Sequence, residues 1–353
     1  MNYSELAAAA RGKMGEWCRA CPVCDGRGCR NHIPGPGAKG VGDVAIRNHD
    51  AWGDLRVNMD TLHEPFVADT SLELFGRELV LPVLIAPVGD VSRHYGPDYD
   101  TLSYNRCVLE AASEFGTIAL TGDGPDESIM REACGLIARL GGAGIPTIKP
   151  WGASVVADRL RMALEANPVA VAMDVDGAGL PFLRGCVPPA GAKSVADLSR
   201  IAKLCDRPFV VKGVMTPQGA EKAVSAGADA IVVSNHGGRV LDGVPATAEV
   251  LPHIVDAVGG DITILVDGGI RTGLDVFRAL ALGADAVMVC RPFVVATYAA
   301  GKQGVSDYLA QLQRELADTM EMCGAATLAD IDEDMVFSSG GPLALGTLLH
   351  VAP

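Results

Sequence analysis

The feature that most constrains the fold is a unit in which a short apolar run is followed by a helical stretch, repeated between Pro208 and Val295. Three such runs are rich in β-branched residues and bounded by glycine or proline: Pro208–Val211, Ala230–Val233 and Ile262–Val266. Runs of this kind are typical of strands buried in a parallel sheet. The segments between them, 217–226 and 273–282, space Ala and Leu as amphipathic helices do. The sequence therefore predicts successive β-then-α units.

The same alternation extends over most of the chain. Five further strand candidates are Val83–Ala86, Thr117–Leu120, Pro146–Ile148, Val169–Met173 and Ala286–Val289. Helical stretches lie between them at Ser103–Glu114, Ser154–Ala166 and Val195–Leu204. Eight such units in about 200 to 250 residues predict a (β/α)8 TIM barrel. A doubly wound sheet would place a Gly-rich phosphate turn after its first strand, and the APVGD that follows Ile85 does not match that turn.

The predicted barrel begins late in the chain. Residues 1–75 are rich in Gly, Pro and Cys and form the expected N-terminal cap. Residues 76–353 form the expected barrel domain, and we expect the tail after Met322 to pack back on it. A chain of 353 residues, 49% of them hydrophobic, can bury a core of this size.

Charge and hydropathy limit the partners. The formal net charge of -14 argues against nucleic acid or an anionic membrane surface as the main partner. No apolar run approaches the ~20 residues that span a bilayer, and the N-terminus lacks the apolar core of a signal peptide. We therefore expect a cytoplasmic protein, and we separately expect a homo-oligomer.

Polar residues follow the strands at their carboxyl ends, where barrel enzymes build their active sites. They are Lys212, then Ser234, His236 and Arg239, then Asp267, Gly268, Gly269 and Arg271, then Cys290 and Arg291. The loops after the last two strands commonly bind phosphate in this fold. Their glycines let backbone N–H groups approach an anion, and the two arginines give charge-assisted contacts. These loops predict a phosphate site; the alternative is a tight turn with two surface arginines.

Two segments carry a resemblance to a known family. VVKGVMTPQGAEKAVSAGADAIVVSNHGGRVLDGVPAT and LVDGGIRTGLDVFRALALGADAVMVCRPFV resemble the FMN-dependent 2-hydroxy acid oxidase and dehydrogenase family, which includes glycolate and L-lactate oxidases. The resemblance is dense over 209–295, looser over 79–177 and weak in the cap. It implies that FMN is bound and that a small, lactate-like 2-hydroxy acid is oxidised to its 2-oxo acid.

The resemblance also implies catalytic roles. His236 would be the base, since imidazole titrates near neutral pH. Arg239 would hold the substrate carboxylate, because a guanidinium fork can bind it through two hydrogen bonds. Lys212 would stabilise negative charge on the reduced flavin. Asp176 would orient the histidine and stabilise its charged form.

The binding residues implied by the resemblance come from the ends of the strands. For FMN they are Pro87, Val88, Gly89, Thr121, Lys149, Lys212, Ser234, Asp267, Gly268, Gly269, Arg271, Cys290 and Arg291. For the substrate they are Arg239, Trp151 and Arg184. Lys149 and Trp151 stand where the family has Gln and Tyr, Asp174 lies near a usual Thr, and a cap Tyr is absent near Pro36. The resemblance therefore leaves the particular acid open.

The remaining histidines receive no role, because an isolated histidine is more often a structural residue than a base. These are His32, His49, His63, His94, His253 and His350. His236 differs from them because it stands two residues after a strand end, within SNHGGR.

The cap contains four close cysteines, Cys18, Cys21, Cys24 and Cys29, spaced C-x2-C-x2-C-x4-C. This spacing is near the bacterial ferredoxin run, which has three residues before its last cysteine, and it differs from the paired knuckles of a zinc ribbon. Zinc, an iron–sulfur cluster and unligated thiols all stay open. We expect one metal centre rather than disulfides, because a reducing cytoplasm disfavours disulfides.

Two other functions are compatible with such a chain. One is a flavin-dependent isomerase or another redox enzyme on the same barrel. The other is a metal- or redox-sensing module that merely binds FMN. The presence of both His236 and Arg239 favours the oxidase, and a cluster near the flavin would pass electrons to an external acceptor.

Overall fold

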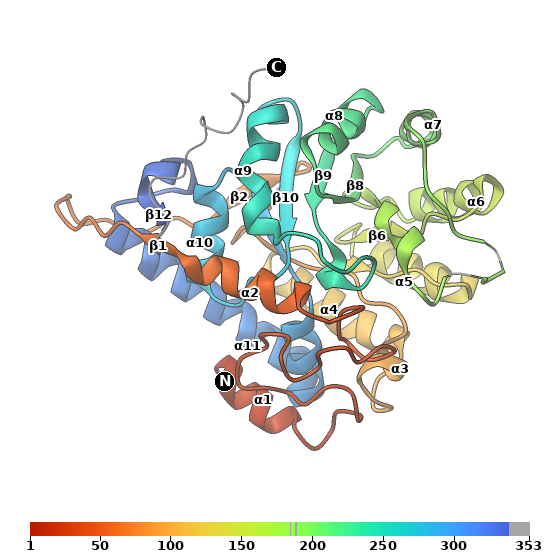
Figure 1. The fold of residues 1–353 in the computed structure, drawn as a ribbon, viewed down its shortest axis with the longest axis horizontal. Coiled ribbons are helices and arrows are strands. Elements are labelled where there is room, and N and C mark those ends of the chain that lie inside the picture. The colour runs from red at the N-terminus through yellow and green to blue at the C-terminus, as the bar shows by residue number, and fades with distance from the viewer. Residues whose placement is uncertain (184, 188, 339–353) are drawn as a thin grey trace.

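A computed structural model describes residues 1–183, 185–187 and 189–338, and its centre is a closed parallel sheet (Figure 1). The order is β4-β11-β10-β9-β8-β7-β6-β5. Its strands are β4 (Val83–Ile85), β5 (Leu120–Thr121), β6 (Ile145–Ile148), β7 (Val171–Asp174), β8 (Phe209–Val214), β9 (Ala230–Val233), β10 (Thr263–Asp267) and β11 (Ala286–Val289). A parallel bridge between Ile85 and Ala119 joins the two ends of the sheet. The predicted (β/α)8 barrel is confirmed.

The strands are apolar along their whole length because both of their faces are buried. On β11, Ala286 and Met288 belong to the cluster inside the barrel, whereas Val287 and Val289 pack with the residues under the helices. This alternation is the two-residue period of a strand. Two strands have the bounds that the sequence predicts, while β5 begins later than expected, since Ala119 makes only the bridge to Ile85.

Helices surround the sheet. They are α3 (Val91–Tyr95), α4 (Thr101–Phe115), α5 (Glu127–Arg139), α6 (Ala153–Glu165), α7 (Val195–Leu204), α8 (Pro217–Ser225), α9 (Thr247–Val258), α10 (Gly273–Ala281) and α11 (Arg291–Cys323). Helix α11 bends at Ala300 and Gly301, where the backbone leaves helical geometry. Short 3-10 turns follow two strands, η1 (Val175–Gly179) after β7 and η2 (His236–Gly238) after β9. Two more, η3 (Leu328–Asp330) and η4 (Glu333–Met335), lie near the end.

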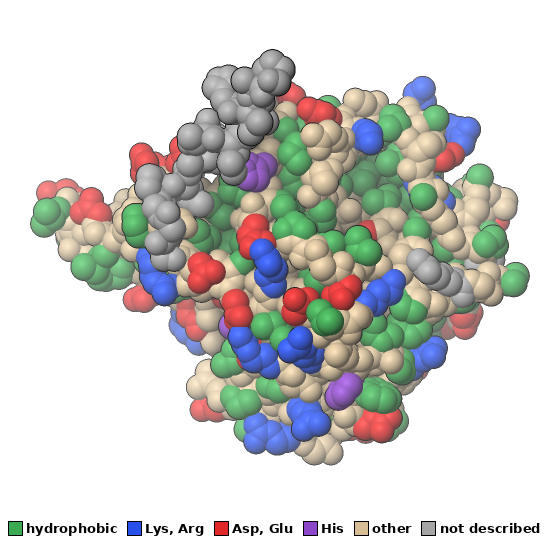
Figure 2. All heavy atoms as spheres, in the orientation of Figure 1, with side chains coloured by type: hydrophobic (Ala, Val, Ile, Leu, Met, Phe, Trp, Pro, Cys, Tyr) green, Lys and Arg blue, Asp and Glu red, His purple; other side chains and the backbone are tan. Residues whose placement is uncertain are grey.

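The N-terminal cap folds onto the barrel through two helices. Helix α1 (Tyr3–Ala10) packs against α11, and α2 (Val44–Asp54) packs against α9 and η2 (Figure 1). Residues 11–43 between them contain neither α-helix nor strand. Acidic and basic side chains lie close together on the face shown in Figure 2. Arg47 of α2 forms an ion pair with Glu249 of α9 at 2.7 Å. Exposed pairs of this kind add little stability.

Short antiparallel pairs connect the cap with the rest of the chain. Strand β1 (Leu55–Val57) pairs with β12 (Val336–Ser338), so the tail packs back as expected over the described residues, and 339–353 lie outside them. Strands β2 (Leu72–Leu74) and β3 (Arg77–Leu79) form a hairpin. The boundary expected after residue 75 falls in the turn of this hairpin. Across the described part of the chain, none of the helices is long and apolar enough to cross a membrane.

Candidate active site

A cavity of about 480 Å³ opens at the carboxyl ends of the barrel strands, and we call it the main cavity. Its size is typical of small-molecule sites. Thirteen residues proposed from the sequence lie in its wall: Pro87, Val88, Gly89, Lys149, Lys212, His236, Arg239, Asp267, Gly268, Gly269, Arg271, Cys290 and Arg291. Residues from six of the eight strand ends therefore converge on one cavity.

Four proposed residues lie behind the wall. Trp151 is fully buried, and its Nε1 donates to Asp123 Oδ2 at 2.6 Å, so the structure does not place it against a substrate. Thr121 is buried at the end of β5. Ser234 accepts hydrogen bonds from Lys212 Nζ at 3.0 Å and from the backbone N–H of His236 at 3.2 Å. The fourth is Asp176, which supports the histidine. Arg184 lies outside the described residues.

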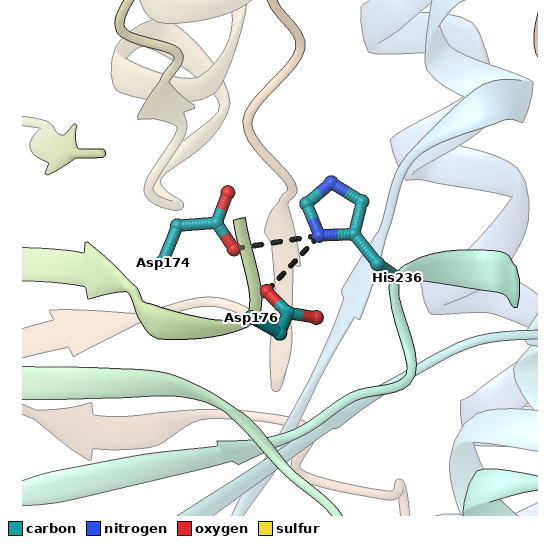
Figure 3. Close-up of side chains that lie close together, drawn as sticks. All are labelled: Asp174, Asp176 and His236. Carbon is teal, nitrogen blue, oxygen red and sulfur yellow. Dashed lines mark hydrogen bonds and ion pairs between the residues drawn. The ribbon is translucent and has the colours of Figure 1, made fainter. Parts of the chain in front are cut away.

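His236 is held by two carboxylates (Figure 3). Its Nδ1 lies 3.1 Å from Asp176 Oδ1 and 3.4 Å from Asp174 Oδ1, while its Nε2 points away from both. The backbone at His236 is left-handed, with φ of 55°, which is uncommon for a residue with a side chain. Gly213 makes room for Asp176, because a Cβ there would lie 2.6 Å from the Asp176 Cβ. Such local strain is typical of functional sites.

Cations compensate the carboxylates beneath the histidine. Lys149 Nζ forms an ion pair with Asp174 Oδ2, and Lys212 Nζ lies 3.5 Å from Asp174 Oδ1 and 3.6 Å from Asp267 Oδ2. Burial by itself would raise the pKa of Asp174, but Lys149, His236 and Lys212 hold it well below its usual value. Asp174 is therefore ionised at neutral pH.

Asp176 differs from its neighbour, because burial raises its pKa. The ligand atoms of Asp174, Asp176 and His236 lie within 4.8 Å of one another, which is close enough for a metal site. Lys149 and Lys212 already supply positive charge to Asp174, so a cation would be repelled there. We interpret the group as an anchored histidine.

Arg239 joins the barrel to the N-terminal cap. Its Nη1 donates to the carbonyl oxygens of Gly35 and Gly37 at 2.6 and 3.2 Å. A guanidinium has five N–H donors, so its Nε and the Nη2 hydrogen that does not face His94 stay available for an anion. The cap thus fixes the orientation of this arginine.

His94 was given no role from the sequence, and the structure places it in the wall of the main cavity. Its Nε2 lies 3.5 Å from Arg239 Nη2, and its ring centroid lies 5.1 Å from that of Phe182. Burial and the charge of Arg239 lower the pKa of His94 to about 3, so its ring is neutral at neutral pH. Its place in α3, the short helix that follows β4, could have drawn attention to it. The sequence alone assigns His94 no role, because isolated histidines are more often structural residues.

The phosphate loop after β10 is fixed by α2. Gly268 and Gly269 have φ of 95° and 86°, and a Cβ on Gly269 would lie 2.0 Å from the carbonyl oxygen of Asn48. Trp52 Nε1 donates to the carbonyl oxygen of Gly268 at 2.7 Å. The glycines are therefore required for the approach of α2, in addition to the approach of an anion expected from the sequence.

Two arginines beside this loop suit a phosphate. Arg271 Nε donates to the carbonyl oxygen of Cys24 at 2.6 Å, whereas its Nη2 is buried without a hydrogen-bond partner among the described residues. Arg291 begins α11, and the amino end of a helix attracts anions. An unpaired buried N–H next to a helix amino end fits the phosphate of FMN.

Comparison with known proteins identifies the family. Residues 161–338 match the FMN-dependent dehydrogenases. The chain is 34% identical over 338 residues to an L-lactate dehydrogenase of Actinobacillus pleuropneumoniae, a match that covers 82% of this chain and 88% of that protein. It is 54% identical over 137 residues to an L-lactate dehydrogenase of Acinetobacter baylyi, where the match covers 39% of this chain and 36% of that protein.

Solved structures agree with these matches. A mandelate oxidase variant with 2-hydroxy-phenylacetamide superposes with a TM-score of 0.77 at 30% identity, and covers 93% of this chain and 96% of that one. A second mandelate oxidase variant, with an FMN adduct, has a TM-score of 0.71 at 32% identity over 83% of this chain and 91% of that one. The predicted cofactor FMN and the predicted oxidation of a 2-hydroxy acid are confirmed at the level of the family. The chain belongs to the FMN-dependent dehydrogenases, the family of flavoenzymes that oxidise 2-hydroxy acids.

Proposed function

We propose that the chain oxidises a small 2-hydroxy acid with an apolar side chain to the 2-oxo acid, with His236 as the base. The observation that carries this proposal is the anchored histidine, which lies in the wall of the main cavity together with Arg239. FMN, when bound, accepts the two electrons that the substrate loses.

His236 takes the proton in this proposal. If Nδ1 donates to Asp176, the lone pair of Nε2 is directed away from the carboxylates and can accept the proton of the substrate. The imidazolium that forms then faces the carboxylates of Asp176 and Asp174, which stabilise its charge. The histidine is thereby oriented, and the charge that it gains in the reaction faces two carboxylates.

Arg239 and its neighbours select the substrate. The free donors of Arg239 bind the carboxylate, and the backbone carbonyls of the cap prevent the guanidinium from turning away. The wall next to it is apolar, formed by Leu180, Phe182 and Leu183. We infer that this wall accommodates the side chain of the acid, such as the methyl group of lactate or the phenyl group of mandelate.

The flavin would lie between the substrate and the phosphate loop. Gly268, Gly269, Arg271 and Arg291 would hold its phosphate, and Lys212 would place a positive charge against the ring system. Lys212 is almost fully buried, and burial alone would lower its pKa, but the carboxylates of Asp174 and Asp267 raise it above its usual value. It therefore stays charged, as stabilisation of an anionic reduced flavin requires.

The test is anaerobic mixing of the FMN-loaded protein with a panel of 2-hydroxy acids, each in both enantiomers. Bleaching of the flavin absorbance by lactate or mandelate, and little bleaching by acids with charged side chains, is expected. Absence of bleaching by any 2-hydroxy acid would refute the proposal. Repeating turnover under air and with an artificial acceptor identifies the electron acceptor.

We further propose that the enzyme acts as a homo-oligomer in the cytoplasm. Support for the compartment comes from the cysteines, since all ten are unpaired in the structure, as is usual in a reducing environment. Sedimentation analysis and cell fractionation test these two points.

A further inference from the structure

A second cavity lies within the N-terminal cap, and we call it the thiol cavity. All four cysteines of the C-x2-C-x2-C-x4-C run are in its wall. The rest of the wall is Arg19, Gly26, Gly28, Pro36, Tyr95, Arg291 and Val295. Four thiols that converge on one small cavity, without a disulfide, are an arrangement typical of a metal centre.

The backbone of the cap is shaped to bring these thiols together. A Cβ on Gly28 would lie 2.6 Å from the Sγ of Cys21, so only glycine leaves space for that sulfur. Ala20 and Asn31, at the two ends of the run, have left-handed backbones with φ of 43° and 62°. Residues with side chains adopt this conformation at a cost. The segment 11–43 lacks regular secondary structure, and a bound metal would provide the stability that it cannot obtain from backbone ladders.

The spacing of the thiols distinguishes between metal centres. Four thiolates around one zinc ion lie about 3.8 Å apart, because each Zn–S bond is about 2.3 Å. Within the described residues, no three of these sulfurs lie within 4.8 Å of one another. A [4Fe–4S] cluster binds each of its four thiolates through a different iron, so its ligands stand farther apart than those of one zinc ion. The observed spacing therefore favours a cluster over zinc.

The charge around the thiol cavity is suited to such a cluster. A core ligated by four thiolates carries net negative charge, which is costly to bury without a cation. Arg291 provides one, with its Nη1 4.0 Å from Cys29 Sγ. Arg271 also reaches the cap, through the carbonyl oxygen of Cys24.

We propose that Cys18, Cys21, Cys24 and Cys29 bind an iron–sulfur cluster. Pro36, Tyr95 and Arg291 belong to the walls of both cavities, so one layer of residues separates the cluster from the main cavity. Given the proposed function, this position makes the cluster the exit for electrons. With both groups bound, the cluster would supply a one-electron path from the reduced flavin to two molecules of a one-electron carrier protein, and the protons released on flavin reoxidation would go to solvent.

The direct test is metal and sulfide analysis of protein purified without oxygen. About four iron ions and four acid-labile sulfides per chain are expected, together with an electron paramagnetic resonance signal after reduction by dithionite. One equivalent of zinc in place of iron would overturn the proposal. Neither metal, with four titratable thiols in the cap, would overturn it equally.

Variants locate the cluster. Cys21→Ser and Cys24→Ser should each lose most of the iron and sulfide, whereas Cys205→Ser, a partly buried cysteine at the end of α7, should keep both. Equal iron in all three proteins would contradict the assignment. Should the cap variants fail to fold, the analysis of the unaltered protein still decides.

The cluster and the proposed function can fail separately. His236→Ala should keep its iron and sulfide while losing flavin reduction. Protein that contains the cluster but does not oxidise any 2-hydroxy acid would refute the function and leave the cluster in place. Protein that bleaches with substrate but lacks iron would do the reverse.

Discussion

The carboxyl ends of the barrel strands and the N-terminal cap meet at the same cavity, yet they are stabilised in different ways. The strands are apolar on both faces, and their loops start from fixed points of a closed sheet. Residues 11–43 of the cap have no such framework and are held by single contacts to the barrel, among them those of Arg239 and Arg271.

This contrast separates two tasks. The proposed base His236 and the proposed flavin partner Lys212 come from strand ends and are supported by other strand-end residues such as Asp174. The cap supplies the contacts that orient Arg239 and close the phosphate loop. Changes to the barrel edge should therefore alter the chemical step, and changes to the cap contacts should mainly alter binding.

The largest effect is expected at the barrel edge. His236→Ala should reduce the rate of flavin reduction by about a thousandfold, since a positioned base contributes about that factor. FMN should stay bound, because the phosphate residues are untouched. Stopped-flow absorbance measures the rate, and the FMN content of the purified variant measures binding.

The exposed His253 on α9 provides the matched control. His253→Ala should reduce flavin at the normal rate. A His236→Ala enzyme that kept more than a tenth of the normal rate of flavin reduction would show that His236 is not the base. It would also contradict the proposal that the strand ends determine the chemical step.

The next largest effect is expected where the two regions meet. Arg239→Lys should lower kcat/KM for a 2-hydroxy acid by about a hundredfold. Lysine cannot bind a carboxylate through two parallel hydrogen bonds as a guanidinium does, and it loses the hydrogen bonds to the carbonyl oxygens of Gly35 and Gly37. The loss should be smaller for the corresponding 2-hydroxy amide, which lacks the charge. Arg161→Lys, on the exposed side of α6, is the control. Equal losses for acid and amide would show that Arg239 acts only on the fold.

The same contrast explains what could be predicted from the sequence. Strand ends in a closed barrel lie at one edge by necessity, so motifs such as SNHGGR could be placed together without a structure. The side-chain directions could not: Trp151 turns toward Asp123 and leaves the main cavity, while His94 enters it. Those directions depend on buried partners far along the chain. For the cap, local spacing identified the four cysteines, but only the structure shows that the cavity they line shares wall residues with the main cavity.

His94 gives a test of the cavity in its empty state. Because its pKa is about 3 in the folded chain, against the ordinary histidine value of 6.5 in an unfolded chain, the unfolded state binds an additional proton below pH 6.5. Stability from the neutral ring is complete above pH 6.5 and is lost as the pH falls toward 3. Urea unfolding at pH 7.5 and 5.5 should show that His94→Gln is spared a loss of about 1.4 kcal/mol that the unaltered protein suffers.

The exposed His253 again provides the comparison. His253→Gln makes the same substitution at an exposed position of α9 and controls for the exchange of His for Gln itself. If His94→Gln and the unaltered protein lost stability in parallel between pH 7.5 and 5.5, the ring of His94 would have to be solvated, and its place in the wall beside Arg239 would be wrong.

The smallest effect is expected at a cap contact of the phosphate loop. Trp52→Phe keeps a buried ring and removes one hydrogen bond, to the carbonyl oxygen of Gly268. A bond of this kind contributes about 1 kcal/mol, so FMN should bind about fivefold more weakly. Flavin reduction in the FMN-saturated variant should stay normal, because His236 and Lys212 are unaffected.

Trp17→Phe makes the same change where the indole packs edge-on against His32, and it should alter neither the FMN affinity nor the rate of flavin reduction. FMN titration by fluorescence quenching measures the affinity. A slower reduction step in Trp52→Phe at full FMN occupancy would mean that the cap shapes the chemistry as well as the binding, and the two regions would then have to be treated as one catalytic unit.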